Sequence, residues 1–212
     1  VPKPTADYID QASQEPQRLA TPQRLLIIMD LNGALIHRPK RNEPSKFVGR
    51  PFVKPFLEYL LASFSVMVWS SARPENVDKM CSQLFTPEQR RQLVTEWGRD
   101  MLGLNAAQYN EKVQVYKQLD KVWDFAKIGH WHPERLDGQL FGQHNTLLID
   151  DSVLKASSEP FNLIQITEFV GQREQMSKDV LGQVVGYLEQ AKMQQDVSRF
   201  VKRKPFFEDG GW

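Results

Sequence analysis

The sequence predicts an α/β fold with a mostly parallel central sheet that is covered by helices on both faces. Short apolar runs alternate with helical stretches along most of the chain, which is the order expected when helices connect parallel strands. With 212 residues, 41% of them apolar and 25% charged, the chain has the composition of an ordinary globular protein with a sizeable core. We therefore expect one α/β domain with extensions at its ends.

Five apolar runs are expected to form the strands of this sheet. They are residues 24–31, 65–72, 113–116, 146–149 and 162–166. Helices are expected over residues 54–64, 74–85 and 86–102. Thr86 caps the last of these helices and Pro87 occupies its first position, which is a common way to begin a helix. A helical turn is expected after Lys117.

Composition divides the chain into three parts. Residues 1–23 are rich in Pro, Gln, Ala and Ser, which is typical of an arm or linker. Residues 24–170 hold the expected strands and form the core domain. Residues 171–212 hold an amphipathic helix of about 18 residues and a basic-aromatic tail, "VSRFVKRKPFFEDGGW". The arm and the tail either bind a partner or cover the surface of the fold itself.

The charges and the single cysteine exclude several classes of function. Lys and Arg total 27 against 26 Asp and Glu, so the overall charge favours neither nucleic acid nor a membrane as partner. Cys81 excludes an internal disulfide, fits a reducing intracellular compartment and is interpreted as a small core residue. His130 and His132 lack further spaced ligands, so "HWH" is interpreted as a surface loop rather than a zinc site.

Polar side chains follow four of the expected strands. They are Asp30, Asn32, Ser70, Lys117, Asp150 and Asp151. In such sheets the ligand crevice lies beyond the carboxyl ends of the strands, so these groups should converge. Carboxylates there can bind Mg²⁺, and the ammonium group of Lys117 can neutralise phosphoryl oxygens. Asp30 could then attack phosphorus and form an aspartyl-phosphate.

Other residues compete for two of these positions. Ser71 competes with Ser70, which is favoured because it directly follows the strand. Lys112 and Lys121 compete with Lys117, which is favoured because it ends the third strand.

In this order, the four segments resemble the motifs of the haloacid-dehalogenase (HAD) superfamily, and most closely its FCP/SCP-type, or NLI-interacting-factor-like, phosphatase branch. The segments are "MDLNGALIH", "VMVWSSARPENVDKM", "VYKQL" and "LLIDDS", and "GRPFVKPFLEYL" resembles a further family segment. The resemblance covers residues 24–170. It implies a HAD-like (Rossmannoid) three-layer sandwich without a large cap domain, since residues 72–112 are too few to form one.

The resemblance also implies a role for each site residue. Asp30 would be the nucleophile, Ser70 would hold a phosphate oxygen, and Lys117 would stabilise charge on the phosphate. Mg²⁺ would be bound by Asp30, Asp150, Asp151 and the backbone carbonyl of Asn32.

A basic loop follows the first strand and in the family lies beside the active site. Its predicted substrate rim consists of Arg38, Lys40, Arg41 and Arg50. Such a rim would accept a phosphorylated or acidic protein segment, whereas the plain alternative is a solvated loop. By resemblance, branch members dephosphorylate serines of protein tails, notably that of RNA polymerase II, and are often nuclear. We therefore expect a phosphorylated Ser/Thr segment as partner and a nuclear or cytoplasmic location.

Asn32 departs from the family pattern, which has a general acid/base aspartate at this position. Asn has no titratable proton near neutral pH, and general acid–base catalysis typically contributes ~10²–10⁴-fold, so turnover should be slow. Three explanations are open: an introduced substitution that traps phosphoprotein, a natural "DLNG" subgroup, or chemistry that needs no acid. Ala34, a second departure, favours a natural Asn. The alternative function is a pseudophosphatase that serves as a protein-interaction module.

Overall fold

The central sheet has five strands in the order β5-β4-β1-β6-β7, and all four pairings are parallel. The computed structural model describes residues 1–40 and 42–212. The strands are β1 Leu26–Met29, β4 Ser65–Trp69, β5 Glu96–Trp97, β6 Thr146–Asp150 and β7 Leu163–Gln165. A separate antiparallel hairpin pairs β2 Ile36–His37 with β3 Val48–Gly49. The predicted α/β class with a mostly parallel sheet is confirmed.

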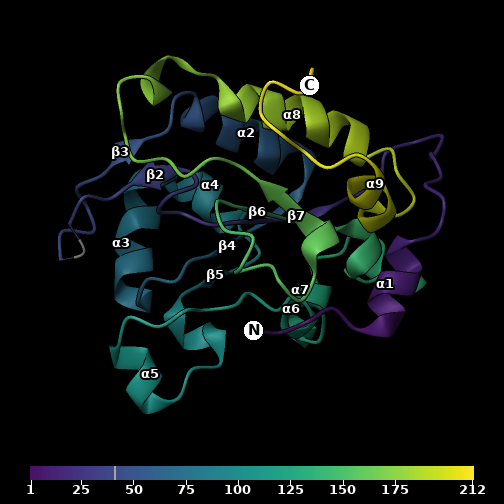
Figure 1. Cartoon of the computed structure of the whole chain (residues 1–212), viewed down its shortest axis with the longest axis horizontal. Coiled ribbons are helices and arrows are strands. Elements are labelled where there is room, and N and C mark those ends of the chain that lie inside the picture. Colours follow the sequence, from purple (N-terminus) through teal and green to yellow (C-terminus); the bar gives the residue numbers. More distant parts are fainter. Residues whose placement is uncertain (41) are drawn as a thin grey trace.

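Helices cover both faces of this sheet, as Figure 1 shows, with α2 and α8 on one side and α6 and α7 on the other. The helices are α1 Ala6–Ala12, α2 Val53–Ser63, α3 Pro74–Leu84, α4 Pro87–Arg91, α5 Ala106–Asn110, α6 Asp120–Trp123, α7 Ala126–Gly129, α8 Val180–Ala191 and α9 Val197–Arg203. Short 3₁₀ turns span Arg99–Leu102, Arg135–Asp137, Gln143–Asn145, Pro160–Asn162 and Gln175–Ser177. None of the helices in the described ranges is long and apolar enough to cross a membrane.

The alternation of strand side chains builds two separate cores. Ile27 and Met29 of β1 pack into a core with α2, α3, α8 and α9. Leu26 and Ile28 point to the other face and pack against residues around α6 and α7. Successive strand residues face opposite sides, and both sides are covered here, so β1 is apolar throughout. This arrangement gives the three layers.

Three sequence-based predictions of secondary structure were wrong. The amphipathic helix expected to have about 18 residues is shorter, because α8 spans Val180–Ala191, 12 residues. Residues 113–116 form no strand and run as irregular chain into Lys117. The predicted helix over residues 86–102 ends after α4, and Glu96 and Trp97 pair with β4 instead. The capping box of Thr86 with Gln89 is present, so the start of the helix is as expected. Pairing with the free edge of β4 competes with continuation of the helix.

The connection between β4 and Lys117 holds only short elements. In the described chain it consists of α3, α4, β5, the turn Arg99–Leu102 and α5. These elements do not form a large cap domain, so no second domain covers the carboxyl ends of the strands.

Both ends of the chain pack onto the fold rather than extending from it. Tyr8 of α1 is buried, and its hydroxyl group donates a hydrogen bond of 2.8 Å to Oδ1 of Asn162. Tyr187 of α8 contacts Trp212, with ring centroids 4.8 Å apart, and donates from its hydroxyl group to the carbonyl of Lys204. Of the two alternatives left open for residues 1–23, the structure thus shows α1 covering the surface of the fold, with Tyr8 and Ala12 buried.

Arg50 holds the loop after β1 in place through hydrogen bonds to backbone carbonyl groups. Its side chain is 3% exposed, and Nε donates to the carbonyl of Ala34 at 2.6 Å while Nη2 donates to the carbonyl of Thr167 at 2.6 Å. The guanidinium group also lies over the ring of Phe169, 5.0 Å from its centroid. Arg50 was predicted at the exposed substrate rim, and this prediction was wrong because buried carbonyl groups require its donors.

We predict that Arg50→Met lowers the free energy of unfolding by about 2–4 kcal/mol, because it leaves buried carbonyl groups without their charged donor. Urea denaturation followed by circular dichroism measures the loss. Arg173→Met removes the same charge from an exposed position and is the matched control. Equal losses in the two variants would contradict this role of Arg50.

Candidate active site

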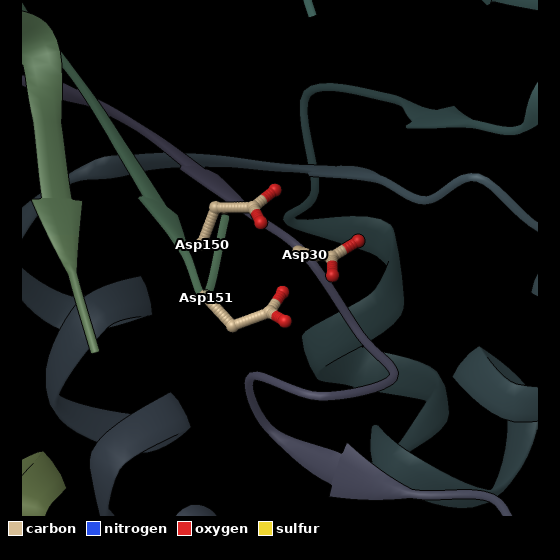
Figure 2. A group of neighbouring side chains, drawn as sticks. All are labelled: Asp30, Asp150 and Asp151. Carbon is tan, nitrogen blue, oxygen red and sulfur yellow. The ribbon is translucent and has the colours of Figure 1, made fainter. Parts of the chain in front are cut away.

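The predicted site residues gather at the carboxyl ends of β1 and β6, which are neighbours in the sheet. Asp30 directly follows β1, and its backbone N–H donates to the carbonyl of Ile149 at 3.0 Å. Asp150 ends β6 and Asp151 follows it. Figure 2 shows the three carboxylates reaching into the same space from these two strands. One oxygen of each lies within 4.8 Å of the others, and Asp30 and Asp150 are buried.

Gly33 allows the loop after β1 to pass close to Asp151. Its φ of +92° lies in the left-handed region, where side chains are disfavoured. A Cβ atom at this position would lie 3.2 Å from the carboxylate of Asp151. The loop is held by a bond from the N–H of Gly33 to the carbonyl of Ile36 and by one from Phe169 to the carbonyl of Gly33. The glycine is therefore required by the site geometry.

Lys117 is fully buried between two of the carboxylates. Its Nζ lies 2.9 Å from Oδ1 of Asp30 and 2.6 Å from Oδ2 of Asp150. Its backbone N–H donates to the carbonyl of Lys155 at 2.7 Å, which fixes the chain without a strand. The competing residues Lys112 and Lys121 are exposed. The structure thus brings Lys117 to the predicted nucleophile.

Lys155 is a second ammonium group in the site and was missed by the sequence analysis. Its Nζ lies 3.1 Å from Asp30, 3.0 Å from Asp150 and 3.2 Å from Asp151. Burial by itself lowers the pKa of Lys155, but the surrounding carboxylates outweigh this effect and raise the pKa above its ordinary value. Its position four residues after Asp151 could have indicated it, because a turn brings residues at this spacing close together and the two side chains have opposite charges.

Ser70 follows β4, on the other side of β1. The side chain is 2% exposed, and its backbone N–H continues the sheet pairing by donating to the carbonyl of Trp97 at 2.9 Å. Its hydroxyl oxygen accepts a hydrogen bond of 3.2 Å from the N–H of Ala72. The hydroxyl hydrogen can still be donated to a phosphate oxygen. Ser71 is more exposed than Ser70.

Asn32 and the basic loop lie at the outside of the site. The side chain of Asn32 is exposed, and its Oδ1 accepts a hydrogen bond of 2.6 Å from the backbone N–H of Arg38. Lys40 is exposed and forms an ion pair of 3.5 Å with Glu43. The prediction for Arg41 lies outside the described residues. Of the predicted rim, Arg38 and Lys40 are thus placed in the loop that follows Asn32.

The "HWH" segment is partly corrected and lies apart from this site. His132 is buried, with 5% of its surface exposed, and its Nδ1 accepts a hydrogen bond from the N–H of Glu134. Its ring packs 4.8 Å from that of Phe141, and burial lowers its pKa. It is therefore a packed core histidine rather than a surface-loop residue. Among the residues the structure describes, the three aspartates are the one group with metal-ligand geometry.

The three carboxylates fit a divalent metal ion. They offer hard oxygen atoms from three different residues, and such oxygens, supplemented by water, are the ligands that Mg²⁺ prefers. Two of the three are buried, and buried carboxylates need a cation or hydrogen-bond donors. A carboxylate nucleophile, a buried lysine, a serine hydroxyl group and an acidic metal site are together suited to phosphoryl transfer.

The sheet order and this set of residues define a HAD-like α/β domain of the phosphatase type. Residues 25–198 match the NLI interacting factor-like phosphatase family. An FCP1 homology domain-containing protein of Schizosaccharomyces pombe is 37% identical over 215 residues, which cover 97% of this chain and 86% of that protein. The chain belongs to the NLI interacting factor-like phosphatase family, as predicted.

Two solved structures are similar to this chain at low identity. A haloacid dehalogenase-like hydrolase, SP0104 from Streptococcus pneumoniae, has a TM-score of 0.46 and 12% identity, covering 78% of this chain and 98% of that one. The fission yeast RNA polymerase II CTD phosphatase Fcp1, bound to beryllium fluoride, has a TM-score of 0.45 and 15% identity. That match covers 93% of this chain and 56% of the other.

Glu159 supports the turn that carries Lys117. Its carboxylate is buried and accepts hydrogen bonds from the N–H of Leu119 at 2.9 Å and from the hydroxyl group of Ser158 at 2.5 Å. Burial raises the pKa of Glu159 above its ordinary value of 4.5, and these hydrogen bonds lower it by less. The folded protein therefore holds this proton to a higher pH than the unfolded chain does.

We predict that the protein loses stability relative to Glu159→Gln as the pH rises above 4.5. The unfolded carboxyl group ionises first, so the loss develops between the unfolded and the folded pKa and amounts to about 1.4 kcal/mol for each unit between them. Urea denaturation of both proteins from about pH 4 to about pH 8 measures the difference. A difference independent of pH would contradict the assignment.

Proposed function

We propose that this domain is a Mg²⁺-dependent phosphatase that takes the phosphoryl group from phosphorylated Ser or Thr in protein segments and turns over slowly. The observation that carries this proposal is the position of Asp30 at the end of β1. Its two carboxylate oxygens are held by Lys117 and Lys155, next to Asp150 and Asp151. A carboxylate oriented in this way at a strand end is suited to attack on phosphorus.

In the proposed first step, an oxygen of Asp30 forms a bond to phosphorus while the bond from phosphorus to the serine oxygen breaks. The hydroxyl group of Ser70 donates to a phosphoryl oxygen, and Lys117 offsets the negative charge that develops there. The leaving serine oxygen then requires a proton. When bound by the three aspartates, Mg²⁺ supplies positive charge that neutralises the phosphoryl oxygens.

The identity of Asn32 explains why turnover should be slow. The amide group cannot donate a proton to the leaving oxygen, nor remove one from the water that hydrolyses the phosphorylated Asp30. The amide oxygen is instead engaged by the N–H of Arg38. The second step has the same requirement as the first, so the phosphorylated form of Asp30 should accumulate with substrates whose leaving group needs no proton.

A protein segment is the proposed substrate because no large cap domain stands over the carboxyl ends of the strands. Lys40 is exposed in the loop that follows Asn32, and Arg38 lies in the same loop. Basic side chains at the rim are suited to bind a phosphorylated or acidic segment. Fcp1, a CTD phosphatase of RNA polymerase II, has a similar fold, and an action on phosphorylated protein is proposed here by that likeness. A nuclear or cytoplasmic location stays a prediction.

The second candidate function is a pseudophosphatase that binds a phosphorylated segment without releasing phosphate. The observation that favours it is the same Asn32, which removes the acid/base group from an otherwise complete set of residues. In that case the protein would be an interaction module, and the phosphate would contact Ser70 and Lys117 without transfer.

We predict that incubation with an aryl phosphate and Mg²⁺ leaves a stable phosphoryl group on Asp30. An aryl leaving group departs without a proton, so the first step does not require an acid at position 32. Intact-protein mass spectrometry detects the added phosphoryl mass, and Asp30→Asn should abolish it. Asp124→Asn changes an exposed carboxylate and is the control. No adduct in the unsubstituted protein would favour the pseudophosphatase.

We predict that Asn32→Asp raises the hydrolysis of a phosphoserine peptide by ~10²–10⁴-fold, because it restores the general acid/base. Phosphate release measured with Mg²⁺ present gives the rate. Asn162→Asp would leave the buried carbonyls of Gln143 and Thr146 without their donor, so the control is Asn110→Asp on the exposed helix α5. If neither the unsubstituted protein nor Asn32→Asp releases phosphate, the enzyme proposal fails and the pseudophosphatase is supported.

A further inference from the structure

Lys155 places its ammonium group among all three carboxylates of the acidic site. It lies 3.0–3.2 Å from one oxygen each of Asp30, Asp150 and Asp151. Lys117 contacts only two of these residues, through a different oxygen of each. The two lysines therefore contact different carboxylate oxygens. Of the two, only Lys155 contacts all three aspartates.

This position is the one that a divalent ion would need. Mg²⁺ binds carboxylate oxygens at about 2.0–2.1 Å and requires near-octahedral geometry. An ammonium group that contacts the same three carboxylates repels a divalent ion and competes with it for their oxygens. Binding of the ion to these three residues is therefore favoured when the lysine moves away.

The charges of the site indicate the same competition. The three carboxylates carry three negative charges, and Lys117 and Lys155 offset two of them. With a divalent ion in place of the Lys155 ammonium group, that ion and Lys117 together offset all three. Buried charges need such compensation. Either the ammonium group of Lys155 or a divalent ion, together with Lys117, neutralises most of the carboxylate charge, so the two cations can replace each other.

The turn that carries Lys155 allows its side chain to leave while the backbone stays in place. The carbonyl of Lys155 accepts the N–H of Lys117 at 2.7 Å, and the N–H of Ser152 donates to Asp150 at 2.9 Å. The side chain of Lys155 is 15% exposed, and Val153 and Leu154 beside it are about half exposed. The ammonium group thus has a route to solvent without disruption of the turn.

We propose that Lys155 is an internal counter-cation that a divalent metal ion displaces when it binds to the three aspartates. The lysine stabilises the acidic site before the metal ion arrives and weakens metal binding. The site then becomes competent for phosphoryl transfer only at a metal concentration sufficient to displace Lys155. This inference rests on the metal role in the proposed function, but its tests measure binding and side-chain accessibility rather than turnover.

The first test compares Mg²⁺ binding by isothermal titration calorimetry in the unsubstituted protein and in Lys155→Met. Methionine keeps the length of the side chain and removes its charge. We expect Mg²⁺ to bind at least about tenfold more tightly to the variant, because the competing state is removed. Lys178→Met removes an equal charge from an exposed position and should bind like the unsubstituted protein. Equal or weaker binding by Lys155→Met would overturn the displacement.

The second test needs no variant, so it remains decisive if Lys155→Met does not fold. The unsubstituted protein is treated with an amine-labelling reagent, and the labelled lysines are quantified by mass spectrometry. Saturating Mg²⁺ should increase the labelling of Lys155 several-fold and leave that of Lys178 unchanged. Unchanged or decreased labelling of Lys155, in protein shown by calorimetry to bind Mg²⁺, would overturn the proposal.

Failure of this proposal can be distinguished from failure of the proposed function. If Mg²⁺ binds to the unsubstituted protein and to Lys155→Met with equal affinity, displacement is wrong and the phosphatase proposal stands. If neither protein binds Mg²⁺, the metal role is wrong and the displacement fails with it. A phosphoryl adduct on Asp30 tests the enzyme proposal independently of both outcomes.

Discussion

The structure depends on compensation of the buried carboxylates at the ends of β1 and β6. Parallel pairing of these two strands forces Asp30 and Asp150 into proximity, and both are almost completely buried. Buried like charges are unfavourable unless cations or donors accompany them. The chain meets this requirement with Lys117, which arrives from the long connection before β6, and with Lys155, which follows β6 in a turn. The position of each of these two segments is therefore constrained by the lysine that it carries.

The loop after β1 is held from two directions, and this links the site to the far end of the chain. On one side Gly33 brings the loop against Asp151. On the other side, Arg50 donates hydrogen bonds to the carbonyl groups of Ala34 and Thr167. The backbone N–H of Thr167 in turn donates to the carboxylate of Glu208 in the C-terminal tail. The basic-aromatic tail thus belongs to the structure that supports the loop. The rings of Phe200, Phe206 and Trp212 in this tail contact the ring of Tyr187 on α8.

Asn32 and Lys155 change the electrostatics of the site in the same direction. The amide of Asn32 carries no charge where a carboxylate would add a negative one, and Lys155 adds a positive charge. Both reduce the net negative charge that a divalent ion would have to neutralise at the site. Under the proposed function, such a site needs a metal ion less for charge compensation and lacks an acid–base group at position 32. Within the proposed function, these two features preserve phosphate binding more than phosphate turnover.

The sequence by itself determined the fold class, the family and the location of the site. Apolar strands that end in Asp30, Ser70 and the pair Asp150–Asp151 already specify a parallel sheet with a polar carboxyl edge, because strand order and periodicity are local properties of the chain. Lys117 was also identified from its segment, although the strand expected before it is absent. Its backbone is instead held by the bond from its N–H to the carbonyl of Lys155 and by Glu159 in the turn that follows.

Only the tertiary structure decided which charges are buried. Arg50 and Lys40 are both basic residues in the same loop region, yet one is buried under carbonyl groups and the other is exposed. Lys155 looks like an ordinary turn lysine until β1 and β6 bring three carboxylates around it. The spacing of Lys155 from Asp151 signals one nearby opposite charge, but the burial of Lys155 against Asp30 depends on a residue distant in sequence and could not be derived from spacing.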